Sequence, residues 1–248
     1  MSGHSKWATI RRKKEKVDAA RGKVFTKLIR EISIAAREGG SNIEANPRLR
    51  MAVDAAKTAN MPADNIERAI KKGAGELEGQ AFEEILYEGY GPGGAALMVS
   101  VMTDNRKRTV GEVRHIFTKR NGTLAEAGAV AWMFKKSGYL TLDISQCPED
   151  EMMEIALEVG ATDVTGDEGV WEIYCAPEDL YRVKTAFEER GKAVASAEIS
   201  MIPSSTVRVD GGNATTLLKL VEELEEHDDV QQVYSNFDID DSVIENMK

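Results

Sequence analysis

VWEIYC (residues 170–175) and YLTLDI (residues 139–144) are two of the strands expected in a part of the chain where strands and helices alternate. The chain around them follows one order of elements. Strands are expected at 139–144, 162–165, 170–175 and 194–201, and helices at 148–160 and 177–190. This β-α-β-β-α-β order is that of ferredoxin-like domains. We therefore predict such a domain over residues 137–203.

Elements on both sides of that domain predict a second α/β domain. Strands are expected at 82–90, 95–103, 130–134, 206–209 and 230–237, and helices after Asp104-Asn105 and at 213–227. Neither flank alone has enough strands to bury one face of a sheet. We therefore expect residues 82–136 and 204–240 to fold together, with the ferredoxin-like domain inserted between them. Four small domains in sequence are the alternative.

Three short amphipathic helices are expected before the first strand. Apolar side chains recur at helical spacing in residues 18–37, after Asn46-Pro47 and after Asn60-Met61-Pro62. We predict a helical domain over 18–75, preceded by a flexible basic arm, 1–17, with too little apolar surface to fold alone. The expected fold class is α+β: an N-terminal three-helix domain plus two α/β sandwich domains, one ferredoxin-like and inserted in the other.

Charge is distributed unevenly along the chain. Residues 1–75 contain 17 Lys and Arg against 8 Asp and Glu, a balance of +9. Residues 76–248 contain 15 against 34, a balance of −19, which completes the net charge of −10. Solubility does not require a basic front on an acidic body. The asymmetry therefore indicates a polyanionic partner, and nucleic acid is the obvious one.

Cations of the arm, and of helix faces turned away from the core, are the candidate contacts to nucleic acid. Trp7 can stack on a base while its neighbours neutralise phosphates. Arg106, Lys107 and Arg108 follow the expected helix cap Asn105, where cations oppose the helix dipole unless an anion binds nearby. An inert tail and solvated helix faces are the alternatives. The predicted nucleic-acid-binding residues are His4, Lys6, Trp7, Arg11, Arg12, Lys13, Lys14, Lys16, Lys23, Lys27, Arg30, Arg48, Arg50, Arg68, Lys71, Lys72, Arg106 and Arg108.

An acidic run lies at the end of the helix expected over 213–227. It comprises Glu222, Glu223, Glu225, Glu226, Asp228 and Asp229. We expect a solvated helix face and turn. Repulsion of nucleic acid, which would orient the ligand toward the basic front, is the alternative.

Several classes of protein have no motif in this sequence. Cys147 and Cys175 form no C-x-x-C pair, and His4, His115 and His227 have no partner at metal-binding spacing. No phosphate-binding loop or hydrolase motif is present, and the longest apolar run is too short to span a bilayer. We expect a cytoplasmic protein that is not an enzyme and has no cofactor, metal, membrane partner or small-molecule substrate.

Several segments together resemble a known family. They are GHSKW (3–7), GKVFTKLIREI (22–32), NPRLR (46–50), NMP (60–62), NIERAIKKG (65–73), YEGYGPGG (87–94), TDNR (103–106) and EVR (112–114). The chain is similar in these segments to the YebC/PmpR family, which includes the mitochondrial translational activator of cytochrome c oxidase subunit I. The likeness runs the whole length and is densest over the first half.

The resemblance implies three domains around a cleft, no known enzymatic activity and a role with nucleic acid. The leading hypothesis is a transcriptional regulator that binds DNA. The alternative is a ribosome-associated translation factor that contacts ribosomal RNA and relieves stalls at proline-rich stretches. Two other classes stay open from the residues alone: an interaction module whose inserted domain binds a protein or small ligand, and a hydrolase acting on nucleic acid.

Overall fold

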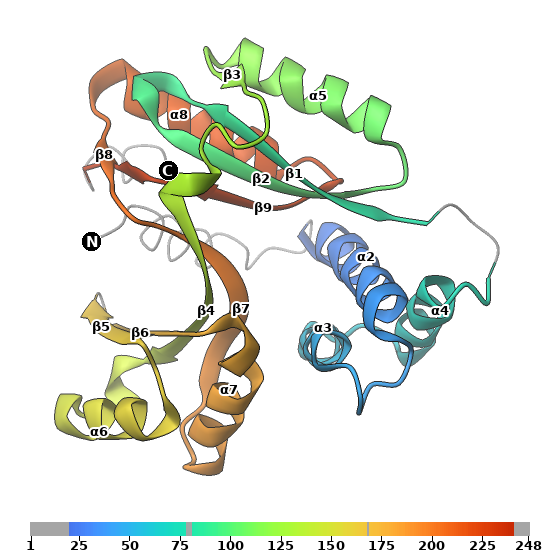
Figure 1. Cartoon of the computed structure of the whole chain (residues 1–248), viewed down its shortest axis with the longest axis vertical. Helices are drawn as coiled ribbons and strands as arrows, with labels where there is room; N and C mark the ends of the chain where they lie inside the picture. The colour runs from blue at the N-terminus through green and yellow to red at the C-terminus, as the bar shows by residue number, and fades with distance from the viewer. Residues whose placement is uncertain (1–19, 78–80, 168, 241–248) are drawn as a thin grey trace. The chain divides into compact units, whose positions relative to one another are not determined.

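The structure is a computed structural model, and it describes residues 20–77, 81–167 and 169–240. The chain divides into two compact units, Met1–Met133 with Pro203–Lys248, and Phe134–Ile202. The first is called the main unit here and the second the insert; each contains a four-stranded sheet (Figure 1). The finer domain boundaries predicted from the sequence stay predictions.

Three helices open the described part of the main unit. They are α2 (Ala20–Gly39), α3 (Pro47–Thr58) and α4 (Ala63–Gly73). Their facing sides form one core in which Ile32, Leu49 and Val53 are at most 2% exposed. Asn46 caps α3, because its side chain accepts the N–H of Leu49 and donates to the Ala35 carbonyl oxygen at 2.8 Å. The three-helix region predicted from apolar spacing is confirmed.

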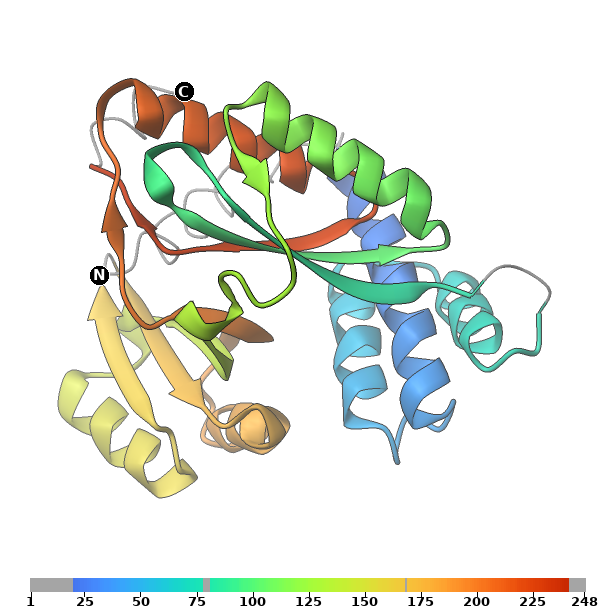
Figure 2. The same ribbon diagram turned by 45° about the horizontal axis from the view of Figure 1, so that its top comes forward.

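The sheet of the main unit is antiparallel, with strand order β3-β1-β2-β9. Its strands are β1 (Glu83–Tyr90), β2 (Ala96–Thr103), β3 (Thr123–Leu124) and β9 (Val230–Ser235). Helices α5 (Arg106–Lys119) and α8 (Gly211–Glu225) lie side by side on one face of this sheet (Figure 2). The core between helices and sheet includes Val99, Phe117 and Leu217, all fully buried. Because β9 follows the insert in the chain and pairs with β2, the two flanks of the insert form one sheet.

Short elements join these strands. A tight turn, η1 (Pro92–Gly94), connects β1 to β2, and Gly93 adopts φ 77° there, which favours glycine. Strands β8 (Val207–Arg208) and β10 (Phe237–Asp238) pair in parallel as a separate two-stranded ribbon.

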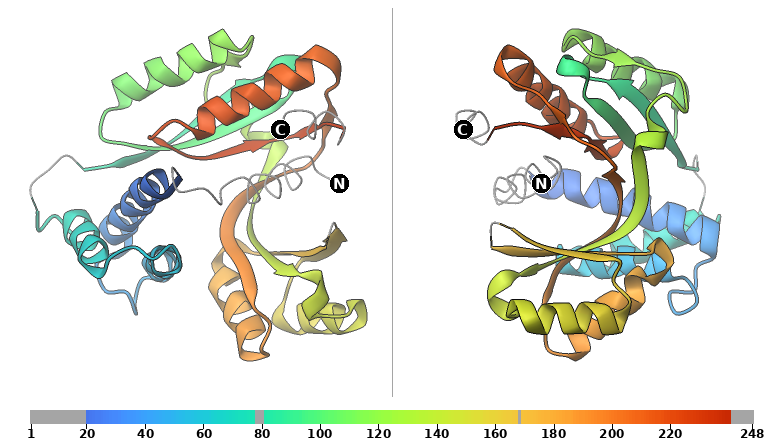
Figure 3. Two further views of the ribbon diagram at one scale, coloured as in Figure 1. Left: turned by 180° about the vertical axis from the view of Figure 1, so that it is seen from behind. Right: turned by 60° about the vertical axis from the view of Figure 1, so that its left-hand side comes forward.

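The insert has the strand order β5-β6-β4-β7. Its elements are β4 (Phe134–Asp143), η3 (Ile144–Gln146), α6 (Glu149–Val159), β5 (Asp163–Asp167), β6 (Val170–Cys175), η4 (Pro177–Asp179), α7 (Leu180–Glu189) and β7 (Val194–Pro203). Helices α6 and α7 lie on the same face of the sheet (Figure 3). This is the ferredoxin-like arrangement, and the predicted α+β fold class is confirmed.

The strand predicted over 130–134 is wrong. Residues Ala131–Met133 form a short 3₁₀ turn, η2, and β4 begins only at Phe134. The reason is the carboxylate of Glu88, which accepts the backbone N–H groups of Val130 at 2.7 Å and Ala131 at 2.8 Å. These N–H groups are therefore not available to a sheet partner. The two-residue strand β3 was not predicted, because it is too short to show alternation.

Two further features of the described residues concern their helices and their cysteines. No helix among them combines the length and apolar character needed to cross a bilayer. Cys147 and Cys175 are both buried free thiols, and burial raises the pKa of each.

Candidate nucleic-acid interface

The predicted contacts fall into two groups by position. His4, Lys6, Trp7, Arg11, Arg12, Lys13, Lys14 and Lys16 lie outside the described residues. The other ten lie on α2, α3, α4 and α5. For both groups the role in nucleic-acid binding stays a prediction.

Three of the α2 cations, Lys23, Lys27 and Arg30, have partners within the chain, although Lys23 is exposed. Lys27 donates to the Glu225 carbonyl oxygen at 3.1 Å and Lys23 donates to that of Glu226 at 3.2 Å. These carbonyls stand at the C-terminal end of α8, where a helix leaves carbonyl groups unpaired and carries a partial negative charge. The end of α8 is thus a site for cations within the chain itself. Helical spacing places Lys23, Lys27, Arg30 and Arg37 in one predicted stripe along α2, and the first two of these residues bind the end of α8.

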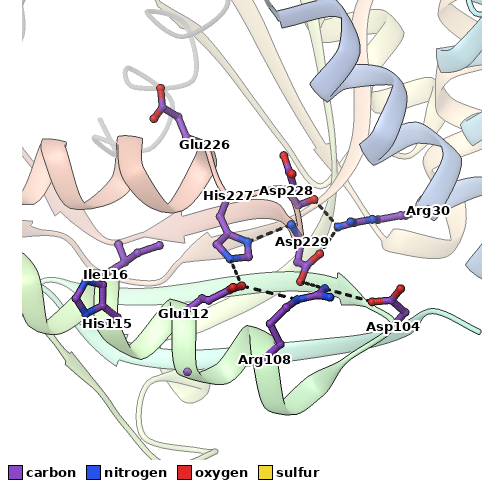
Figure 4. A pocket seen from close by; sticks show the side chains of 11 residues that line it. Arg30, Asp104, Arg108, Glu112, His115, Ile116, Glu226, His227, Asp228 and Asp229 are labelled. Carbon is purple, nitrogen blue, oxygen red and sulfur yellow. Dashed lines mark hydrogen bonds and ion pairs between the residues drawn. The ribbon is translucent and has the colours of Figure 1, made fainter. Parts of the chain in front are cut away.

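Arg30, the next cation of that stripe, binds a buried carboxylate. Its Nη1 lies 2.8 Å from Asp229 Oδ1, and the exposed fractions of the two side chains are 12% and 3%. The same nitrogen donates to the carbonyl oxygens of Met102 and Asp228. Figure 4 shows the side chain reaching from α2 to the turn before β9. Arg30 therefore joins α2 to strand β2 and to the turn that precedes β9.

Asp229 also receives two groups from α5. Arg108 Nη2 lies 2.8 Å from Asp229 Oδ2, and the Thr109 hydroxyl donates to the same oxygen at 2.6 Å. Burial alone would raise the pKa of Asp229. The hydrogen bonds from Thr109 and Arg108, and the charges of Arg30 and Arg108, instead lower that pKa to about 2. The solvated turn predicted here is wrong at Asp229, which is a structural anion.

An open groove of about 780 Å³ lies over this junction (Figure 4). His227 stands in it with both ring nitrogens engaged: Nδ1 accepts the N–H of Asp229 at 3.1 Å, and Nε2 lies 2.9 Å from Glu112 Oε2. The donor atoms of Glu112, His227 and Asp229 lie within 4.8 Å of one another, as metal ligands could. Each of these residues already has a hydrogen-bond partner in the protein. Their proximity is explained by the fold, and we assign no metal to them.

Most predicted contacts on α3 and α4 also have partners within the chain. Arg48 forms ion pairs with Glu31 at 2.8 Å, Glu38 at 2.7 Å and Glu84 at 2.9 Å. Burial lowers the pKa of Arg48, but hydrogen bonds to Glu31 and Glu84 and the charges of these two carboxylates raise it overall above its usual value.

The other predicted contacts on α3 and α4 differ in the partners that they have. Arg50 lies 3.5 Å from a Glu44 carboxylate oxygen, and Lys71 lies 2.6 Å from that of Glu67. Lys72 stands over the Phe82 ring at 4.2 Å from its centroid. Arg68 is exposed and has no ion pair among the described residues. Of this group, Arg68 best fits the predicted outward cation.

Helix α5 carries exposed cations that are outside the set of predicted nucleic-acid-binding residues. Arg106 is exposed as expected, and Arg108 is tied to Asp229. Lys107, Arg114 and His115 are exposed too, and neither Lys107 nor Arg114 has an ion pair among the residues the structure describes. Arg114 and His115 follow Lys107 by seven and eight residues. Positions at this spacing share a helix face, so the sequence could have shown that these three side chains lie together.

Comparisons with known proteins agree over the whole chain. The family model described as the TACO1/YebC protein N-terminal domain matches residues 5–76, and that of the TACO1/YebC second and third domain matches residues 82–237. A "probable transcriptional regulatory protein" of Geobacter sulfurreducens is 56% identical over 247 residues, covering 100% of both chains. One of Pelotomaculum thermopropionicum is 55% identical over 243 residues, covering 97% of this chain and 100% of the relative.

A solved structure gives the same result. The crystal structure of a conserved hypothetical protein from Aquifex aeolicus superposes with a TM-score of 0.85 at 55% identity. The match covers 91% of this chain and 93% of that one. With both family models matched and relatives this similar along their full length, the chain belongs to the TACO1/YebC family.

Proposed function

We propose that this protein is a non-enzymatic regulator of gene expression that binds DNA through cationic side chains. The observation that carries the proposal is the charge distribution, 17 cations against 8 carboxylates in residues 1–75 and 15 against 34 in the rest. Phosphate neutralisation by Lys and Arg supplies a large share of the affinity of such proteins for nucleic acid. The relatives are named as probable transcriptional regulatory proteins, which favours DNA as the ligand.

Contacts within the chain narrow down which cations serve this function. Lys23, Lys27, Arg30 and Arg48 have carbonyl or carboxylate partners in the protein, so binding through them would require those contacts to break. The arm, residues 1–17, holds six cations, Lys6, Arg11, Arg12, Lys13, Lys14 and Lys16, against the single carboxylate of Glu15. We therefore assign the main electrostatic contribution to the arm.

Neutralising two arm cations should weaken DNA binding. We expect Lys13→Ala/Lys14→Ala to lower the affinity for a 20-base-pair duplex about tenfold and to reduce the slope of log K against log salt by nearly 2, because about 0.9 is lost per phosphate contact. Fluorescence anisotropy at several salt concentrations measures both quantities. Lys57→Ala/Lys219→Ala is the matched control, because both lysines are exposed and have no ion pair among the described residues.

The two double variants separate the arm from general charge. Equal loss in both would mean that only net charge matters, and unchanged affinity in Lys13→Ala/Lys14→Ala would rule the arm out. RNA is the competing ligand, because its phosphates offer the same chemistry. Tighter binding to a structured RNA than to duplex DNA, at equal salt, would replace DNA by RNA in the proposal.

A further inference from the structure

Helix α5 presents a face to solvent that contains no carboxylate. Its core side is formed by Thr109, Val113, Ile116 and Phe117, which are buried. The opposite side, by helical spacing, is formed by Lys107, Gly111, Arg114, His115 and Thr118, all of them exposed. We call these five residues the outer face of α5.

The cations of this helix divide by the side on which they lie. On the flank, Arg108 pairs with Asp229 at 2.8 Å, and Lys119 pairs with Glu223 at 2.5 Å. On the outer face, Lys107 and Arg114 have no ion pair among the described residues. The carboxylates that pair with α5 therefore lie along its flank. The cations of the outer face can interact with solvent or with a partner molecule.

The position of these cations is unfavourable for the isolated helix. Arg106 and Lys107 stand in the first turn, which contains no acidic residue, and Asn105 caps it by accepting the N–H of Arg108. Positive charge at a helix N-terminus opposes the helix dipole, and it is stabilising only when an anion lies nearby. Asp104 pairs with Arg108 at 3.2 Å. Among the described residues, no carboxylate pairs with Arg106 or Lys107.

The centre of the outer face is open. A Cβ atom built on Gly111 would meet no atom within 4 Å, so no neighbour in the fold requires a glycine there. Lys107 and Arg114 are seven residues apart, which is about 10 Å along the helix axis. A sugar-phosphate strand can present neighbouring phosphates over that length. The face therefore fits a sugar-phosphate strand that lies along α5 and contacts a cation at each end.

We propose that the outer face of α5 is a second nucleic-acid contact surface, which holds the phosphate backbone of the ligand independently of the arm. The inference rests on the proposed function and adds to it Lys107, Arg114 and His115, with Gly111 as the point of closest approach. The binding is independent of base sequence, because phosphate contacts position a ligand without reading its bases.

A charge placed at the open centre tests the surface without disturbing the fold. Gly111→Glu puts a carboxylate between Lys107 and Arg114, and Gly111→Gln puts a neutral side chain of the same size there. Both residues favour helix more than glycine does, so both variants should melt at or above the wild-type temperature. We expect Gly111→Glu to bind the 20-base-pair duplex about tenfold more weakly than Gly111→Gln, with the difference shrinking as salt rises.

A second variant tests the outer face of α5 by removing its two cations and measuring the salt dependence of DNA binding. Lys107→Ala/Arg114→Ala should reduce the salt slope by nearly 2, while Lys57→Ala/Lys219→Ala leaves it unchanged. Equal affinities of Gly111→Glu and Gly111→Gln, with an unaltered slope in the double variant, would overturn the inference and leave the proposed function standing. Absence of any DNA or RNA binding by the wild-type chain would overturn the proposed function and this inference with it.

An acidic protein is the competing occupant of a cationic face. If Gly111→Glu lost a protein partner from cell extracts while its affinity for the duplex matched that of Gly111→Gln, the surface would be a protein interface. That result would also overturn the inference.

Discussion

Replacing Asp229 by alanine is expected to lower the free energy of unfolding at pH 7 by about 3 kcal/mol, because removing one member of a buried ion pair leaves its partners unpaired. Three groups would lose their acceptor: Arg30, Arg108 and Thr109. Chemical denaturation measures the change. Asp104→Ala is the matched control, since that carboxylate pairs with Arg108 but is 38% exposed, and it should cost less than about 1 kcal/mol.

The pH dependence of unfolding gives an independent readout of the same carboxylate. The pKa of Asp229 is about 2 in the folded protein against an ordinary 3.8. A lowered folded pKa means that the carboxylate stabilises the fold above pH 3.8 and that this contribution, about 2 kcal/mol, disappears as the pH falls toward 2. Wild type should therefore lose more stability than Asp229→Ala between pH 4 and pH 2. Parallel stability curves would contradict the role assigned to Asp229.

Replacing Glu88 by alanine is expected to have an effect of similar size, about 3 kcal/mol, because each buried N–H left without an acceptor costs about 1 kcal/mol or more. The buried carboxylate accepts the N–H groups of Gly128 at 2.7 Å, Val130 at 2.7 Å and Ala131 at 2.8 Å. Burial raises the pKa of Glu88, but these three hydrogen bonds lower it overall. Denaturation gives the stability change.

Amide hydrogen exchange locates that effect in the chain. In Glu88→Ala the amides of Gly128, Val130 and Ala131 should exchange faster than the rest of the main unit, because their acceptor has gone. Glu83→Ala, on the same strand and exposed, is the control and should leave them protected. Unchanged exchange at the three amides in Glu88→Ala would mean that the carboxylate does not hold this loop.

The fold was predictable because it depends on local periodicity. Strands and helices of the insert could be located from the sequence, and their order alone specified the ferredoxin-like topology. The strand predicted at 130–134 was wrong for a reason outside that segment. The carboxylate that takes its N–H groups belongs to Glu88, more than 40 residues earlier. Periodicity does not report such a distant partner.

The candidate site was harder to predict than the fold. Helical spacing showed correctly that Lys23, Lys27 and Arg30 share one face of α2, but not which element covers that face. The carbonyls of Glu225 and Glu226 come from about 200 residues away. Asp229 was likewise grouped with solvated acids, since a run of charge gives no sign that one of its members is buried.

The outer face of α5 was missed for a different reason. Arg106, Lys107 and Arg108 were treated as one cluster because they are adjacent in the chain. Successive helix residues point about 100° apart, and Arg108 lies on the flank while Lys107 lies on the outer face. Grouping by face, which joins Lys107 to Arg114, would have found the surface from the sequence.

The most direct test of DNA binding is crosslinking of the protein to nucleic acid in cells, followed by sequencing of what is recovered. A ribosome sedimentation profile of the same cells should be run beside it. We expect DNA fragments enriched well above an uncrosslinked control, and the protein away from the ribosome fractions. Recovery of ribosomal RNA, with the protein sedimenting on ribosomes, would contradict the assignment of DNA as the ligand. Recovery of no nucleic acid above the control would contradict nucleic-acid binding altogether.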